Sequence, residues 1–191
     1  MHPATAAHIA RKLAVHFVAD DPDPGLVAAM TAAFRDTGGD LPSVYRAMLD
    51  HPAAWRGFGA KVKPPFELIA SGMRALGLQE VHIRQMKRNR IRRHIVLPLR
   101  RMGQSYMAPP GPDGWPEEAE AWIQPQGLAA RIAWAMEASQ MRQVAPPDPR
   151  AFVDTALGEA ASGRLIWAAG AAETRRQGVG LVLASAEFNR R

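Results

Sequence analysis

Proline residues lie at several predicted helix starts along this chain and constrain its fold more than any other feature. Asp23-Pro24 and Asp148-Pro149 each pair a residue that caps a helix N-terminus with a proline at the first helical position, where its missing N–H costs nothing. Pro3, Pro64-Pro65 and Pro125 likewise precede apolar residues that recur every three or four positions. The pattern predicts a series of short helices.

The expected core is formed by the apolar faces of these helices. No stretch shows the alternation typical of a strand, and 191 residues with 47% hydrophobic content suit one core better than two. We therefore predict an all-α, single-domain helical bundle over residues 1–191, with a long ordered Pro/Gly-rich loop at about residues 103–124. The predicted faces are Ala6, Ile9, Ala10, Leu13 and Phe17; Val27, Met30, Ala33 and Phe34; Leu41, Val44, Tyr45, Met48 and Leu49; Phe66, Ile69, Met73 and Leu76; Ile83, Met86, Ile91 and Ile95; Leu128, Ile132, Ala135 and Met136; and Phe152, Val153, Ala156 and Leu157.

Several classes of function are excluded or disfavoured by missing residues and motifs. The chain has no cysteine, which excludes disulfides, thiol nucleophiles and cysteine-ligated metals. It also lacks a Gly-x-Ser-x-Gly elbow, a phosphate-binding glycine loop and a His-Glu-x-x-His motif. No run approaches 18 apolar residues, and no signal peptide is visible in this stretch. We expect no cofactor and no membrane span.

The net charge of +6 is concentrated in one segment. Between Val81 and Pro112 the chain carries eight cations and no acid. Such a field can neutralise several phosphates of a polyanion, but no aromatic residue is interleaved with it to stack on bases. We favour a solvated or ion-paired helix from about His82 to Leu97, halted by Pro98, with polyanion binding through residues 84–101 as the alternative and no nucleic-acid partner expected. The candidate polyanion-binding residues are Arg84, Lys87, Arg88, Arg90, Arg92 and Arg93.

The predicted loop combines aromatic residues with acids. Paired carboxylates beside aromatic platforms are what saccharide binding or glycoside hydrolysis requires. A loop of this length also needs a reason to be ordered. We favour a buried Trp115 that anchors the loop to the core, and keep a saccharide site as the alternative. That site would use Asp113, Glu117 and Glu118 as catalytic carboxylates and Tyr106, Trp115 and Trp122 as ligand-binding aromatics.

Two groups near the N-terminus have the residue types of a metal site without its spacing. His8 and His16 share one face of the first helix but stand about 12 Å apart at roughly 1.5 Å per residue, so one ion cannot bridge them. The acidic cluster of residues 20–23 lacks the glycine and the distal glutamate of an EF-hand loop. We expect no metal ion at either group.

One long segment and both ends of the chain resemble a known family. The segment GQSYMAPPGPDGWPEEAEAWIQPQGLAARIAWA from Gly103 to Ala135, the opening His2-Pro3-Ala4-Thr5 and the closing Leu183–Phe188 resemble the bacterial family catalogued as domain of unknown function 1800. In that family the HPAT segment lies well inside the protein. The resemblance therefore implies the C-terminal part of a longer bacterial protein, from the cytoplasm or the periplasm, and carries over no catalytic residues.

These observations lead to one preferred function and two alternatives. We expect a non-catalytic helical scaffold or interaction module of a larger bacterial protein, whose partner is a protein: the missing N-terminal half or a second copy. The first alternative is an enzyme that acts on a saccharide or cell-envelope polymer through residues 113–122. The second is the polyanion binder described above.

Overall fold

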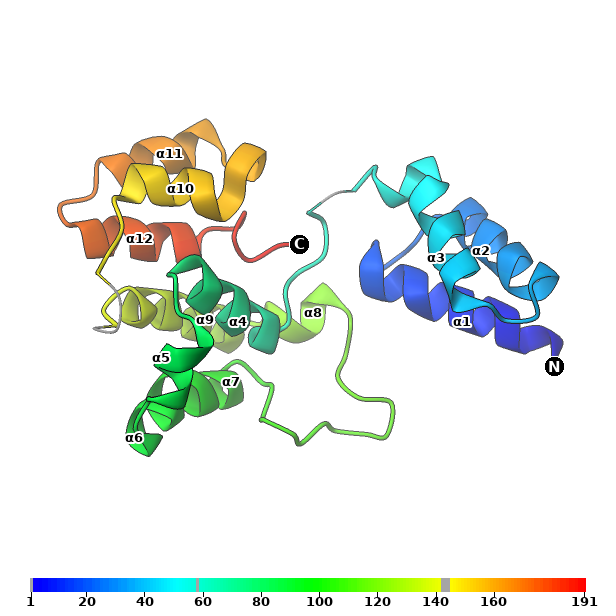
Figure 1. Cartoon of the computed structure of the whole chain (residues 1–191), viewed down its shortest axis with the longest axis horizontal. Coiled ribbons are helices and arrows are strands. Elements are labelled where there is room, and N and C mark those ends of the chain that lie inside the picture. The colour runs from blue at the N-terminus through cyan, green and yellow to red at the C-terminus, as the bar shows by residue number, and fades with distance from the viewer. Residues whose placement is uncertain (1, 58, 142–144) are drawn as a thin grey trace. The chain divides into compact units, whose positions relative to one another are not determined.

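The computed structural model describes residues 2–57, 59–141 and 145–191, and these residues form an all-α fold (Figure 1). Within them no strand forms, and β pairing is confined to isolated bridges such as Val62–Arg190. The all-α prediction is confirmed. The chain divides into unit 1, residues 1–61, 117–119 and 191, and unit 2, residues 62–116 and 120–190. Because unit 1 draws on three separated segments, the chain cannot be cut into two contiguous pieces, and the single domain stays a prediction.

Unit 1 is built from three helices and a short turn. Asp23 begins the second helix as predicted, since its Oδ1 accepts the N–H groups of Gly25 and Leu26 at 2.8 and 3.1 Å. Asp40 begins the third helix by accepting the Ser43 N–H at 2.9 Å. The elements are α1 (Pro3–Phe17), α2 (Pro24–Asp36), α3 (Leu41–Asp50) and the 3-10 turn η1 (Pro52–Ala54).

The core of unit 1 is narrower than the predicted apolar faces. Phe17, Leu41 and Leu49, which we expected in the core, expose 53%, 41% and 51% of their surface. Each helix of a three-helix unit can bury only one row of side chains, so the neighbouring row faces outward. The buried residues are Ala6, Ala10, Ala14, Leu26, Met30, Phe34, Val44, Met48 and Ala53.

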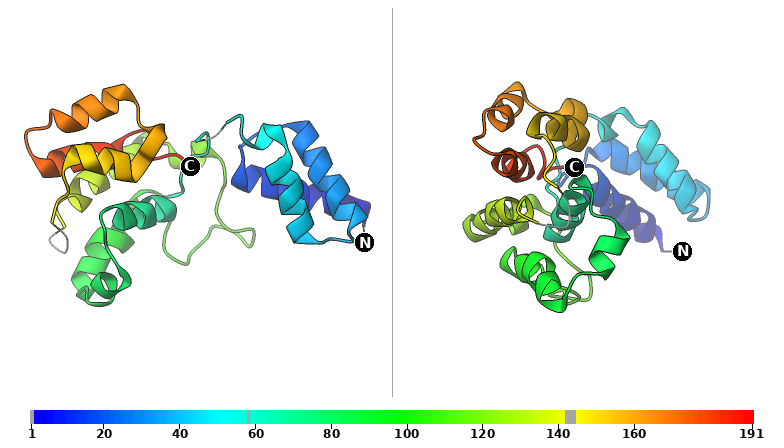
Figure 2. Two further views of the ribbon diagram at one scale, coloured as in Figure 1. Left: turned by 45° about the horizontal axis from the view of Figure 1, so that its top comes forward. Right: turned by 60° about the vertical axis from the view of Figure 1, so that its left-hand side comes forward.

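Unit 2 holds the remaining helices, of which α9 and α12 pack along each other (Figures 1 and 2). Close packing in this unit depends on small residues. A Cβ atom at Gly72 would lie 2.4 Å from the ring of Trp134. The helical elements are α4 (Pro65–Ala75), α5 (Glu80–Arg84), α6 (Arg88–Ile91), the π-helix η2 (Arg92–Val96), α7 (Leu97–Arg101), α8 (Ala119–Trp122, of which Ala119 belongs to unit 1), α9 (Pro125–Ala138), α10 (Pro149–Leu157), the 3-10 turn η3 (Gly158–Ala160), α11 (Gly163–Gly170) and α12 (Arg175–Ala184).

The predicted core faces of unit 2 are only partly correct. Phe66, Leu128 and Ile132 are exposed by 52%, 42% and 44%. On α9 the buried row contains Trp134 and, unexpectedly, Arg131, which displaces the predicted row by about one residue. The buried residues are Leu68, Ile69, Met73, Leu76, Leu78, Met86, Leu99, Met102, Trp134, Ala135, Ala138, Met141, Phe152, Val153, Ala169, Val179, Val182, Leu183 and Phe188.

The predicted basic helix is interrupted once and does not stop where we expected. It breaks after α5 and restarts at Arg88, and it then runs through η2 and α7 to Arg101 without stopping at Pro98. Proline removes the N–H that would bond the carbonyl four residues earlier, that of His94. The π-helix widens the backbone just before Pro98, and the indole Nε1 of Trp134 donates to the His94 carbonyl at 3.0 Å. This replacement donor allows the helix to continue through the proline.

The predicted long loop is present between α7 and α8. It turns at Gly103 and Gly114, whose φ angles of 92° and 96° favour glycine, and Met107 adopts a φ of 55°. The short helix α8 occupies the end of the predicted loop range. Among the described residues, no helix combines the length and the apolar character needed to cross a membrane.

Candidate functional site

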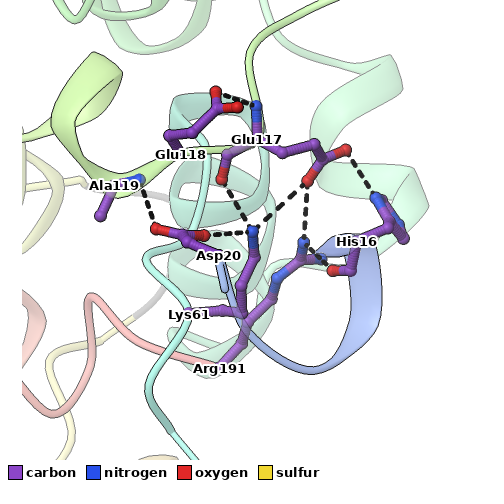
Figure 3. Close-up of polar contacts among 7 residues, drawn as sticks. All are labelled: His16, Asp20, Lys61, Glu117, Glu118, Ala119 and Arg191. Carbon is purple, nitrogen blue, oxygen red and sulfur yellow. Dashed lines mark hydrogen bonds and ion pairs between the residues drawn. The ribbon is translucent and has the colours of Figure 1, made fainter. Parts of the chain in front are cut away.

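A cluster of ion pairs in unit 1 surrounds the side chain of Lys61, of which only 1% is exposed (Figure 3). Its Nζ atom donates to Oδ1 of Asp20 at 2.6 Å and to the backbone carbonyl of Glu117 at 2.7 Å. The same nitrogen lies 3.7 Å from Oε2 of Glu117. An ammonium group has three N–H donors, so two of them form these hydrogen bonds, and the contact with Oε2 of Glu117 is an ion pair.

Asp20, in the turn after α1, ties the cluster to a distant segment. Its Oδ2 atom accepts the backbone N–H of Ala119 at 2.8 Å, while Oδ1 accepts from Lys61. Burial alone would raise the pKa of Asp20, but these two hydrogen bonds and the charge of Lys61 outweigh it and hold the pKa below its ordinary value. Asp20 is therefore anionic at neutral pH.

Glu117 is the second carboxylate of the cluster and faces three basic side chains (Figure 3). Its Oε1 lies 2.7 Å from Nδ1 of His16, and its Oε2 lies 3.8 Å from Nη2 of Arg191. Arg191 also donates from Nη2 to the carbonyl of His16 at 3.0 Å and from its backbone N–H to the carbonyl of Lys61 at 2.9 Å. We call these residues, His16, Asp20, Lys61, Glu117 and Arg191, the Lys61 cluster.

The contacts of the Lys61 cluster are typical of a structural ion-pair network rather than of a reactive lysine. A nucleophilic lysine needs a deprotonated amine that is free to reach substrate. Here the Lys61 nitrogen is buried and held by two oxygen atoms. Glu117, one of the predicted catalytic carboxylates, is held by basic groups at both of its oxygen atoms. The cluster joins residues 117–119 and 191 to the N-terminal helices of unit 1.

The three loop aromatics differ in how deeply they are buried. Trp122, with 2% exposure, takes the buried position, whereas Trp115 is only half-buried and Tyr106 is 63% exposed. The Trp115 and Trp122 rings pack at a centroid distance of 6.3 Å with their planes tilted by 52°. The carbonyl of Trp122 lies against Gly127, where a Cβ atom would come within 2.8 Å of it. Trp122 on α8 is therefore buried more completely than Trp115, and the anchoring role of Trp115 stays a prediction.

The remaining loop carboxylates do not share the environment of Glu117. Asp113 and Glu118 are exposed, and Glu118 accepts the backbone N–H of Glu117 at 3.2 Å through its Oε2. Asp113 belongs to unit 2 together with the loop aromatics, whereas Glu117 and Glu118 belong to unit 1. The saccharide site stays a prediction.

The predicted polyanion-binding side chains all lie on the surface of unit 2. Arg84 pairs with Glu80 at 3.1 Å, and Nε of Arg93 binds Oε1 of Glu137. Lys87 and Arg90 line a hollow of about 550 Å³, and Arg90 also lines an adjoining hollow of about 240 Å³. Arg84 and Arg93 are ion-paired, whereas Lys87 and Arg90 are exposed and line a hollow, and polyanion binding stays a prediction.

The groups first considered for metal binding have other roles. His8 is exposed, and His16 belongs to the Lys61 cluster. Asp20 binds Lys61, and Asp23 caps α2. Across the part of the chain that the structure describes, no group of three or more His, Asp or Glu residues is placed to hold a metal ion.

Sequence reasoning missed Lys61 and Arg191 as members of a site. Lys61 contacts Asp20 and Glu117, which lie 41 and 56 residues away along the chain. The only local signal is a lysine between Ala60 and Val62, two apolar residues, and this is too common to predict a buried cation. Arg191 gives no local signal, because it contacts His16, which lies 175 residues away along the chain.

Comparison with known proteins supports the resemblance found in the sequence. A family model described as "Protein of unknown function (DUF1800)" matches residues 1–190. No curated protein and no solved structure matches the chain.

Proposed function

We propose that this chain, which belongs to the DUF1800 family, is a non-catalytic helical module that presents an apolar surface to a partner protein. The observation that carries this proposal is an outward-facing row on α3. Leu41, Tyr45 and Leu49 are spaced four residues apart and so lie along one side of the helix. Leu41 and Leu49 expose 41% and 51% of their surface, and Tyr45 is half-buried.

Two further aromatic residues widen this row into a patch. The ring of Phe17, 53% exposed, packs edge-on against Tyr45 at 6.2 Å. The indole of Trp55, 56% exposed, donates to the carbonyl of Leu49 at 2.8 Å. We call these five residues the α3 apolar surface. Contiguous exposed apolar residues mark interaction sites, and aromatic residues contribute most of the binding energy at such sites.

The non-catalytic part of the proposal is supported by the state of Glu117. A general acid or base needs a carboxyl group that can exchange a proton with substrate. In the Lys61 cluster both oxygen atoms of Glu117 face basic side chains within unit 1. We infer that this carboxylate stabilises the fold and that the function of the module resides in its surface.

Site-specific photo-crosslinking in bacterial cells tests the proposal. A photoreactive amino acid at position 41 should give a discrete crosslinked protein, because this position lies at one end of the α3 apolar surface. The same amino acid at Ala32, an exposed position on α2, should not. Leu49→Glu should abolish the product formed at position 41, whereas Ala32→Glu should leave it intact, and circular dichroism should show that both variants are folded.

The mass of the crosslinked product identifies the partner. A product of twice the chain mass indicates a second copy, and any other discrete mass indicates a different protein. Equal products at positions 41 and 32, or a product at 41 that Leu49→Glu does not reduce, would contradict the proposal.

A further inference from the structure

A second surface feature lies on unit 2 and is independent of the α3 apolar surface. It is the hollow of about 550 Å³ beside α5 and α6, which we call the basic hollow. Pockets that hold small molecules span about 300–1,000 Å³, so its size suits a compact ligand. The adjoining hollow of about 240 Å³ shares Asn89 and Arg90 with it. The basic hollow is lined by His82, Gln85, Met86, Lys87, Asn89 and Arg90.

The cations that line the basic hollow lack the acidic partners that Arg84 and Arg93 have. Arg84 is paired with Glu80, and Arg93 with Glu137. Within the described part of the chain, no ion pair engages Lys87 or Arg90, and no carboxylate lines the basic hollow. The hollow therefore carries two permanent positive charges, and a concave surface focuses such a field more than a flat one.

The neutral lining of the basic hollow also offers hydrogen-bond donors. Nδ1 of His82 accepts the backbone N–H of Gln79 at 2.9 Å, which places the proton of the neutral ring on Nε2. His82 therefore contributes an N–H donor, as do the side-chain amides of Gln85 and Asn89. Met86 is 7% exposed and belongs to the core of unit 2, so this wall of the hollow is anchored.

From these features we infer that the basic hollow binds a compact ligand that carries several phosphate groups. Arginine recognises phosphate oxygens through its planar fork of donors, and lysine adds a point charge. The lining contains no phenylalanine, tyrosine or tryptophan ring, and the one imidazole, that of His82, offers a smaller surface on which a nucleobase could stack, so we expect the phosphates rather than a base to be recognised. The same absence argues against a nucleic-acid strand as the ligand.

Calorimetric titration of the full chain with sodium tripolyphosphate tests the inference. We expect one binding site, with an affinity that falls as sodium chloride is raised from about 0.05 to 0.3 M. The double variant Lys87→Gln/Arg90→Gln should weaken binding at least about tenfold, since hydrogen bonds to charged groups contribute this much or more. The matched control is Arg100→Gln/Arg101→Gln, which removes the same charge from two exposed positions outside the hollow and should change the affinity less than about twofold.

Two further measurements test whether a base is recognised and where the ligand binds. Adenosine triphosphate should bind about as tightly as tripolyphosphate, because we expect the base to add no contact. On addition of tripolyphosphate, the ring resonances of His82 should shift in nuclear magnetic resonance spectra, and those of exposed His8 should not.

Three results would overturn the inference. The first is equal weakening by the two double variants, which would show a diffuse charge effect. The second is the absence of binding at the lowest salt concentration. The third is a single-stranded oligonucleotide that displaces tripolyphosphate at a lower phosphate concentration.

Discussion

Replacing Lys61 by methionine should destabilise unit 1 by about 3 kcal/mol. Removing one partner of a buried ion pair costs about 3–5 kcal/mol, because the other charge stays buried without compensation. The side chain of Lys61 is 1% exposed, whereas that of Asp20 is 35% exposed. The orphaned carboxylate of Asp20 can therefore be partly hydrated, which places the expected loss at the lower end of the range. Methionine keeps most of the side-chain volume of lysine, so the lost stability measures the contribution of the charge and its hydrogen bonds.

Urea unfolding followed by circular dichroism at 222 nm measures this loss. With a slope of about 2 kcal/mol per molar urea, the transition midpoint should fall by roughly 1.5 M. Lys12→Met, at an exposed position on α1, is the matched control and should stay within about 0.5 kcal/mol of the unmodified chain. Adding Asp20→Asn to Lys61→Met should recover part of the loss, because an amide oxygen can still accept the N–H of Ala119 and carries no charge.

Two outcomes would refute this reasoning. If Lys61→Met unfolds at the same urea concentration as Lys12→Met, the Lys61 cluster contributes no net stability. If adding Asp20→Asn to Lys61→Met lowers the stability further, the unpaired charge of Asp20 does not cause the loss of stability in Lys61→Met.

Two further predictions follow from individual contacts. Trp134→Phe removes the donor to the His94 carbonyl and should lower the free energy of unfolding, measured by heat or urea, by about 1–3 kcal/mol. Adding Pro98→Ala should recover part of this loss, since residue 98 then supplies the missing N–H. If nothing is recovered, the proposed role of the indole is contradicted. The lowered pKa of Asp20 means that its stabilising contribution is complete above its unfolded pKa of about 3.9 and is lost as the pH falls through its lower folded pKa. Urea unfolding between about pH 2 and 6 should therefore show an acid-induced loss of stability that Asp20→Asn reduces, and an unchanged profile in that variant would contradict the cluster's electrostatics.

The helix starts could be predicted because their chemistry is local. Asp23 bonds the N–H groups two and three residues ahead of it, and Asp148 bonds the N–H of Arg150 at 2.9 Å. A capping residue followed by proline therefore indicates a helix start without knowledge of the fold. The stop expected at Pro98 failed for the opposite reason, because its missing hydrogen bond is replaced by Trp134, 36 residues further along the chain.

The members of the Lys61 cluster could not be predicted because their partners are distant in sequence. His16 contacts Glu117, which lies 101 residues away along the chain, and Arg191 contacts His16, which lies 175 residues away. The deeper burial of Trp122 was missed for another reason. Trp115 and Trp122 lie in the same segment, and its residue pattern does not show which ring the fold covers more completely.

Two buried cations of this protein, Lys61 and Arg131, are bound by oxygen atoms of the fold, unlike the exposed Lys87 and Arg90. Lys61 is surrounded by oxygen atoms, and Arg131, 1% exposed, donates to Oδ1 of Asn189 at 3.0 Å and to the carbonyl of Lys63 at 2.8 Å. Burial lowers the pKa of Arg131 to about 10, which still leaves it charged at neutral pH. These two cations are committed to the fold, and removing either leaves buried acceptors unpaired. Lys87 and Arg90 stand in the basic hollow on the surface, where a ligand can replace water around them without disturbing the core. If the basic hollow binds phosphate groups as we propose, Lys87 and Arg90 are the part of the net charge of +6 that the ligand contacts.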